Sequence, residues 1–95
     1  MIINKNGQSF EFYLSLDKIL EAEREDPEYS FLAEMADLGK SMRLISFDRL
    51  MKFCGHGLEE MLSAGFKLDE MADIFTKVLE ETGFISADSE SEDEN

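Results

Sequence analysis

The chain has 95 residues, of which 43% are hydrophobic, and its 22 acidic and 9 basic residues give a net charge of −13. This length makes one small domain. A negative charge of this size repels phosphate backbones and anionic lipids, which excludes direct binding to nucleic acid or to a membrane surface. No apolar run approaches the ~20 residues that cross a bilayer. The first ten residues have no signal-peptide hydrophobic region and the chain has a single cysteine, so we expect a cytoplasmic protein.

Residues 1–14 are predicted to form a β-hairpin. Asn6-Gly7 is the strongest short signal for a two-residue hairpin turn, because both positions must adopt a positive φ. Large apolar side chains then alternate with polar ones at Phe10, Phe12 and Leu14. A two-stranded hairpin is not stable alone, so this apolar face is expected to pack on helices.

Two helices are predicted next, over residues 16–25 and 27–42. Ser15 is the expected N-cap of the first, which should stop before Pro27. Asp26-Pro27 is expected to open the second, with Asp as the cap and Pro at the first helical position.

Two further helices are predicted over residues 46–64 and 68–82. Ser46 is the expected cap of the third helix, and the apolar positions that follow it keep one continuous helical face as far as Leu62. Gly65 and Gly83 are expected to end the third and fourth helices.

Residues 87–95 contain five acids and one apolar residue, Ala87. Such a segment cannot offset its ordering entropy by burial and is predicted to be a disordered acidic tail. The predicted fold class is therefore α+β: a single compact domain over residues 1–86, with an N-terminal hairpin packed on about four helices.

The stretch FCGHG, residues 53–57, holds the only cysteine and the only histidine. Cys54 falls on the apolar stripe of the predicted third helix, where a free thiol behaves as a small buried hydrophobe. On a continuous helix His56 would point about 200° away from Cys54, so the two cannot form a nucleophile–base pair there. A zinc site needs about four ligands, and the chain has no other Cys or His. We therefore predict no catalytic residue and no metal in this stretch. Gly55 and Gly57 indicate either close packing against a neighbour or a local kink.

The sequence has no glycine-rich phosphate loop, no Ser-His-Asp order and no basic patch. No enzyme and no cofactor are predicted. Flexible methionines suit surfaces that repack around a partner, although ordinary core filling explains them as well. The partner-binding residues proposed on this basis are Phe31, Met35 and Met42. Spare apolar surface is also expected to support self-association.

Two segments resemble the tail assembly chaperones of long-tailed bacteriophages and prophages. The first is IINKNGQSFEFYLSLDKILEAE, residues 2–23, and the second is FDRLMKFCGHGLEEMLSAGFKLDEMADIFTKVLEETGF, residues 47–84. The resemblance implies a hairpin followed by a mainly helical body. It also implies a non-enzymatic role in the host-cell cytoplasm, in which the chain holds the aggregation-prone tape measure protein while the tail tube assembles.

Two other functions stay open from the sequence. The net charge also suits an acidic inhibitor or nucleic-acid mimic that occupies a basic site on a host protein. A small virion subunit, such as a head–tail connector component, is the third alternative.

Overall fold

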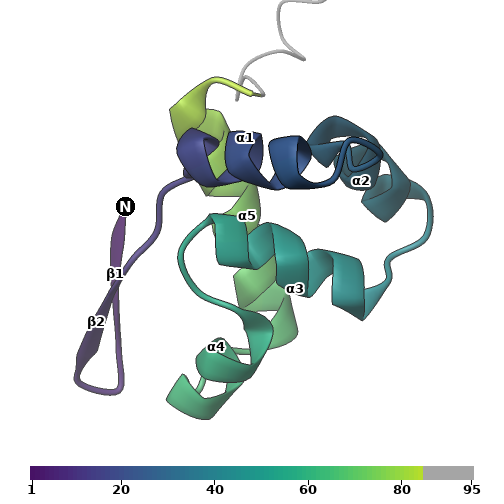
Figure 1. The fold of residues 1–95 in the computed structure, drawn as a ribbon. Helices are drawn as coiled ribbons and strands as arrows, with labels where there is room; N and C mark the ends of the chain where they lie inside the picture. Colours follow the sequence, from purple (N-terminus) through teal and green to yellow (C-terminus); the bar gives the residue numbers. More distant parts are fainter. Residues whose placement is uncertain (85–95) are drawn as a thin grey trace, which may run out of the picture.

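A two-stranded antiparallel hairpin and five helices make up residues 1–84, which are the residues that this computed structural model describes (Figure 1). In chain order the elements are β1 (Ile2–Lys5), β2 (Gln8–Glu11), α1 (Leu16–Glu25), α2 (Phe31–Lys40), α3 (Leu44–Phe53), α4 (Leu58–Ala64) and α5 (Leu68–Thr82). The predicted α+β class is confirmed, with five helices where about four were expected. The predicted acidic tail, 87–95, lies outside the described residues.

The hairpin forms as predicted. Asn6 and Gly7 have φ angles of 52° and 82°, the positive values that a type I′ turn needs. The turn sets the register, in which Ile3 pairs with Phe10 and Lys5 with Gln8. The alternating side chains Phe10, Phe12 and Leu14 are all buried, so the predicted apolar face does pack on the helical body.

The predicted ends of the first and last helices are also confirmed. α1 covers residues 16–25, and the Ser15 hydroxyl accepts a hydrogen bond of 3.3 Å from the backbone N–H of Lys18. α5 covers residues 68–82 and ends at Gly83, which is left-handed with a φ of 88°. Gly65 likewise ends the preceding helix with a φ of 105°.

The predicted helix over 27–42 is shorter than expected, because α2 begins at Phe31. Its cap is Ser30, whose hydroxyl accepts from the backbone N–H of Ala33 at 3.1 Å. Asp26-Pro27 forms a turn instead, in which the N–H of Tyr29 donates to the Asp26 carbonyl at 2.9 Å. Asp followed by Pro suits the first two positions of a β-turn as well as it suits a helix start, and here the turn is the outcome.

The predicted helix over 46–64 is wrong as a single element, because the chain breaks it into α3 and α4. α3 begins at Leu44, ahead of the expected cap Ser46, and the loop 54–57 separates the two helices. Gly55 has a φ of 117°, which no helix residue adopts. A Cβ on Gly55 would lie 3.3 Å from the carbonyl oxygen of Glu11. Gly55 and Gly57 were interpreted as signs of either close packing or a local kink, and close packing against a neighbour therefore applies at Gly55.

Backbone hydrogen bonds explain why the break is favourable. The N–H of Tyr13 donates to the Cys54 carbonyl at 3.1 Å, and the N–H of Ser15 donates to the Phe53 carbonyl at 3.0 Å. The strand that leaves the hairpin thus bonds to carbonyls at the end of α3. These carbonyls would otherwise need partners of their own.

The break leaves the start of α4 without a local cap, since its N-cap position is Gly57. Asp48 of α3 supplies the missing acceptor: the N–H of Leu58 donates to its carboxylate at 2.9 Å. The Lys52 ammonium lies 3.2 Å from the other Asp48 oxygen. The Leu58 N–H first, and Lys52 with it, hold the pKa of Asp48 below its usual value of 3.8.

Replacing Asp48 with Ala is expected to lower the free energy of unfolding by about 0.5–2 kcal/mol, as for the loss of a helix cap. The matched control is Asp73→Ala, which removes an exposed i,i+4 pair with Lys77 of the same 3.2 Å length and should cost about 0.3–0.5 kcal/mol. Urea unfolding followed by circular dichroism measures both. Equal losses in the two variants would show that Asp48 does not act as a cap.

The same contact predicts a pH dependence. Because the folded pKa of Asp48 is depressed, its contribution is present above the unfolded pKa and is lost as the pH falls through the folded value. The difference in unfolding free energy between the wild type and Asp48→Ala should therefore shrink as the pH falls below 3.8.

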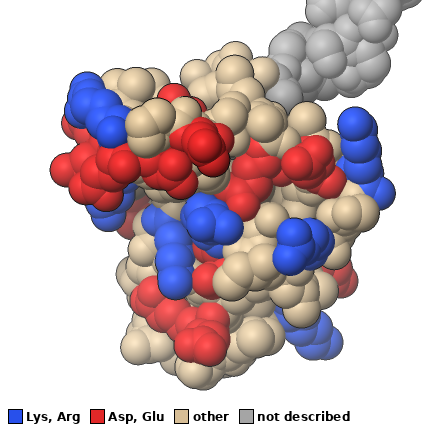
Figure 2. Space-filling view, turned by 45° about the vertical axis from the view of Figure 1, so that its right-hand side comes forward, with Lys and Arg blue, Asp and Glu red and all other residues tan. Residues whose placement is uncertain are grey.

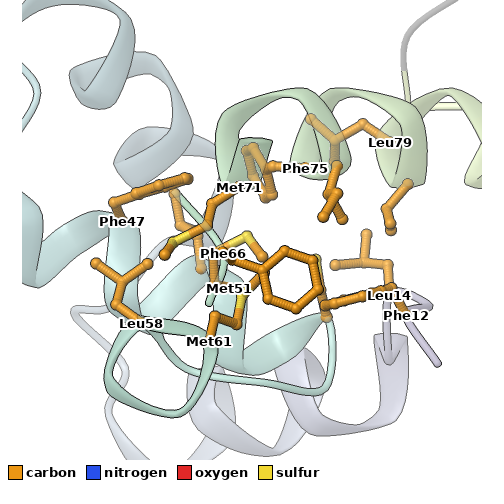
Figure 3. Close-up of a cluster of buried hydrophobic side chains, with 14 of the residues drawn as sticks. Phe12, Leu14, Phe47, Met51, Leu58, Met61, Phe66, Met71, Phe75 and Leu79 are labelled. Carbon is orange, nitrogen blue, oxygen red and sulfur yellow. The ribbon is translucent and has the colours of Figure 1, made fainter. Parts of the chain in front are cut away.

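The hydrophobic core lies where the hairpin, α3, α4 and α5 meet (Figure 3). Its fully buried members include residues of α3, α4 and α5 and of the chain that follows the hairpin, as Phe12, Phe47, Met51, Met61 and Met71 illustrate. α3 is the central helix and contacts α1, α2 and α4. This placement leaves the first turn of α3 at the edge of the fold, where Leu44 and Ile45 are exposed.

Candidate protein-binding surface

Three large apolar side chains project from the turn between α2 and α3. Met42, Leu44 and Ile45 are 50%, 57% and 59% exposed. We call these three residues the apolar ridge. Leu44 lies on the same helical stripe as the buried Phe47 and Met51, three and seven residues later. Its exposure shows that the first turn of α3 extends past the residues that cover the rest of this stripe.

An open cleft lies on each side of the ridge. One, of about 760 Å³, lies between α2 and α3. The other, of about 590 Å³, lies between α3 and α4 and is lined in part by Leu44, Ile45 and Leu58. Ile45 lines both clefts. This shape would allow an apolar segment of another chain to bury side chains in the clefts on both sides of the ridge.

The charge around the ridge differs from that of the whole chain. Between residues 38 and 58 the cations are Lys40, Arg43, Arg49 and Lys52, and the only acid is Asp48. On the face turned forward in Figure 2, which includes the α2–α3 side of Figure 1, Lys and Arg side chains lie between groups of carboxylates. The four cations of this stretch thus lie close to the ridge, while acids line both clefts as well: Glu28, Glu34 and Asp37 in one, and Asp48, Glu59 and Glu60 in the other.

A polar cluster holds α2 against α3 along one wall of the α2–α3 cleft. The Tyr29 hydroxyl donates to one Glu34 oxygen at 2.5 Å, and Arg49 Nε donates to the other at 3.0 Å. The Arg49 guanidinium also lies 5.7 Å from the centre of the Tyr29 ring. Burial first, and the Glu34 carboxylate next, raise the pKa of Tyr29. The phenol therefore stays protonated and acts as a donor that positions the helices.

The three residues proposed for partner binding do not form one surface. Phe31 is 2% exposed, and its ring packs on Phe53 and Phe84 at 5.7 and 5.8 Å. Met35 is half-buried against the core. Only Met42 lies in the open, as part of the apolar ridge.

The sequence did not identify the two most exposed members of the ridge, Leu44 and Ile45. Both lie between the predicted helices over residues 27–42 and 46–64, where the sequence assigned them no role. The available signal was composition: residues 38 to 58 contain one acid in a chain with 22 acidic residues, so this stretch differs from the rest of the sequence.

The FCGHG stretch is a structural junction in this fold. Cys54 is fully buried, and burial raises the pKa of its thiol to about 12. His56 Nε2 lies 3.0 Å from the Glu11 carbonyl oxygen, and Nδ1 lies 2.9 Å from a Glu60 oxygen. The ring also meets Phe10 and Phe12 edge-on, at 5.4 and 5.0 Å. The histidine thus ties the hairpin to α4.

Comparisons with known proteins identify no relative: no family model, curated protein or solved structure matches the chain. Within residues 1–84, no group of three or more His, Cys, Asp or Glu side chains is arranged to hold a metal ion. Among the helices of the same residues, none has both the length and the apolar character needed to span a bilayer. The apolar ridge and its clefts are therefore the candidate functional surface of the described residues.

Proposed function

We propose that this chain is a tail assembly chaperone of long-tailed bacteriophages, a non-enzymatic protein that holds the tape measure protein in the host-cell cytoplasm. The observation that carries the proposal is the apolar ridge, where Met42, Leu44 and Ile45 are half-exposed and Ile45 lines both open clefts. Exposed apolar side chains grouped beside open clefts are typical of sites where proteins bind one another.

The ridge supports holding rather than tight, permanent binding. Apolar burial contributes about 25 cal/mol per Å², and three half-exposed side chains offer a small area. A single contact is therefore weak, and an extended client is held by many copies that each release easily. Met42 adds a flexible thioether that adapts to different segments of a client. The net charge of −13 keeps such a holder and its cargo dispersed.

The order of elements also supports the proposal. A hairpin followed by a mainly helical body is the order that the resemblance in residues 2–23 and 47–84 implies. The acidic-mimic alternative draws its support from net charge alone. A mimic has to present continuous carboxylates, whereas the ridge is flanked by Lys40 and Arg43.

Co-expression with the tape measure protein of the same phage genome tests the proposal. The chain is expected to raise the soluble fraction of that protein several-fold, and Ile45→Asp is expected to abolish the gain. The matched control is Leu62→Asp, since Leu62 is 57% exposed on α4 and lies outside the ridge; this variant should hold the client as the wild type does.

The salt dependence of binding distinguishes a chaperone from an acidic inhibitor. Binding through the apolar ridge should persist at about 0.5 M salt, where exposed charges are strongly screened. Binding that disappears at this salt concentration would favour the acidic inhibitor. Unchanged solubility of the tape measure protein in the presence of the chain would contradict the chaperone proposal.

A further inference from the structure

Charges of both signs flank the apolar ridge: the α2–α3 cleft is lined by equal numbers of acids and cations, and the α3–α4 cleft is lined mainly by acids. Lys40 and Arg43 stand at the α2–α3 turn, at the N-terminal end of α3. Glu59 lines the α3–α4 cleft beside Leu58. None of these three charged side chains forms an ion pair with another residue of the described part of the chain. Unpaired charges of both signs thus border one apolar surface.

This arrangement is complementary to itself under a two-fold rotation. If the α3 helices of two copies lie antiparallel, the ridge of each copy faces the α3–α4 cleft of the other. The same rotation brings the cationic end of one α3 to the Glu59 side of the other, and it does so twice. Apolar groups then meet at the centre and opposite charges meet at both rims, as in protein interfaces generally.

We propose that a second copy of this chain occupies the α3–α4 cleft and that the protein forms a two-fold dimer through the apolar ridge. The complementary charges are the argument for this occupant. A partner of uniformly acidic character would leave Glu59 opposed by like charge, and a uniformly basic partner would do the same to Lys40 and Arg43. A second copy satisfies both signs at once.

The dimer is reversible. Its apolar centre consists of three half-exposed side chains from each copy, which is less than a standard-size interface of about 1,600 Å² provides. Two chains of net charge −13 also repel each other at long range, which weakens the association further. One further step rests on the proposed function. The dimer covers the apolar ridge when no client is bound, and a client displaces the second copy.

Sedimentation equilibrium of the purified chain, without any client, tests the dimer. The wild type is expected to show a monomer–dimer equilibrium. Arg43→Glu alone and Glu59→Arg alone should each weaken it by about tenfold or more, because each places like charges at both rims. An equimolar mixture of the two variants should restore the dimer, because each reversed charge then faces the other.

The equimolar mixture shows whether a variant loses the dimer through these specific charge contacts or through a general change in charge or misfolding. A variant that is merely unfolded is not rescued by a second variant, and circular dichroism of each variant alone checks its fold. Ile45→Asp should also give monomers, and Leu62→Asp should dimerise as the wild type does. A wild type that stays monomeric at about millimolar concentration, or a mixture that remains as monomeric as its components, overturns the proposal.

The dimer measurement and the tape measure experiment test the two proposals independently. The dimer is measured without client, so its failure leaves the tape measure experiment unaffected. Conversely, an intact dimer with no effect on the solubility of the tape measure protein would contradict the proposed function alone.

Discussion

Replacing Phe12 with alanine is expected to lower the free energy of unfolding by about 3–5 kcal/mol. The Phe12 side chain is 0% exposed, and its ring packs edge-on against His56 and Phe66, at 5.0 and 6.2 Å. The truncation leaves a cavity where the hairpin meets the helical body. A small domain is stable by only about 5–15 kcal/mol in total, so this single change removes a large part of the stability. Urea unfolding followed by circular dichroism measures the loss.

The matched control is Tyr13→Ala. Tyr13 is the next residue, points to the opposite side and is exposed, while its backbone N–H keeps the hydrogen bond to Cys54. Its replacement should change the unfolding free energy by about 0.5 kcal/mol or less. Similar losses in the two variants would mean that the hairpin is not anchored through the Phe12 side of its exit strand.

The Cys54 thiol is expected to react with a disulfide reagent such as DTNB about a thousandfold more slowly in the native protein than in the unfolded chain near neutral pH. The thiolate is the reacting form. Burial raises the pKa of Cys54 from 9.0 to about 12, and each unit lowers the thiolate fraction about tenfold below both values. Since the chain has one cysteine, the signal reports on this residue alone.

Two further observations check the account of Cys54. The reaction rate should rise with urea in parallel with unfolding, because exposure of the thiol requires the 54–57 loop to leave the core. The native state should also lose stability as the pH rises from 9.0 toward about 12, because only the unfolded thiol ionises in that range. A native thiol that reacts as fast as the unfolded one would place Cys54 in an accessible, reactive setting.

Local signals in the sequence predicted much of the fold. Asn6-Gly7 determines the hairpin turn because its backbone conformation depends on those two residues alone. Ser15 and Gly83 mark the start of α1 and the end of α5 for the same reason: a cap needs only its own residue and the adjacent turn of helix. The burial of Phe10, Phe12 and Leu14 follows from the two-residue repeat of a strand that packs on one side.

The predictions that failed depend on residues far apart in the chain. The apolar spacing from Phe47 to Leu62 is that of one helix, yet the loop 54–57 interrupts it. The hairpin bonds to the carbonyls of Phe53 and Cys54 from more than thirty positions away in the sequence. Apolar periodicity survived the break because Cys54 and Leu58 still face the core on either side of it.

The sequence by itself determined the α+β class, the hairpin and its turn, and the limits of the first and last helices, because neighbouring residues encode each of them. Only the tertiary structure decided that Phe31 is buried while Leu44 and Ile45 are exposed. The physical reason is that periodicity shows which residues share a face, whereas exposure depends on what covers that face. Phe84 and Phe53 cover Phe31, and the first turn of α3 extends past its neighbours and leaves the apolar ridge open to a partner.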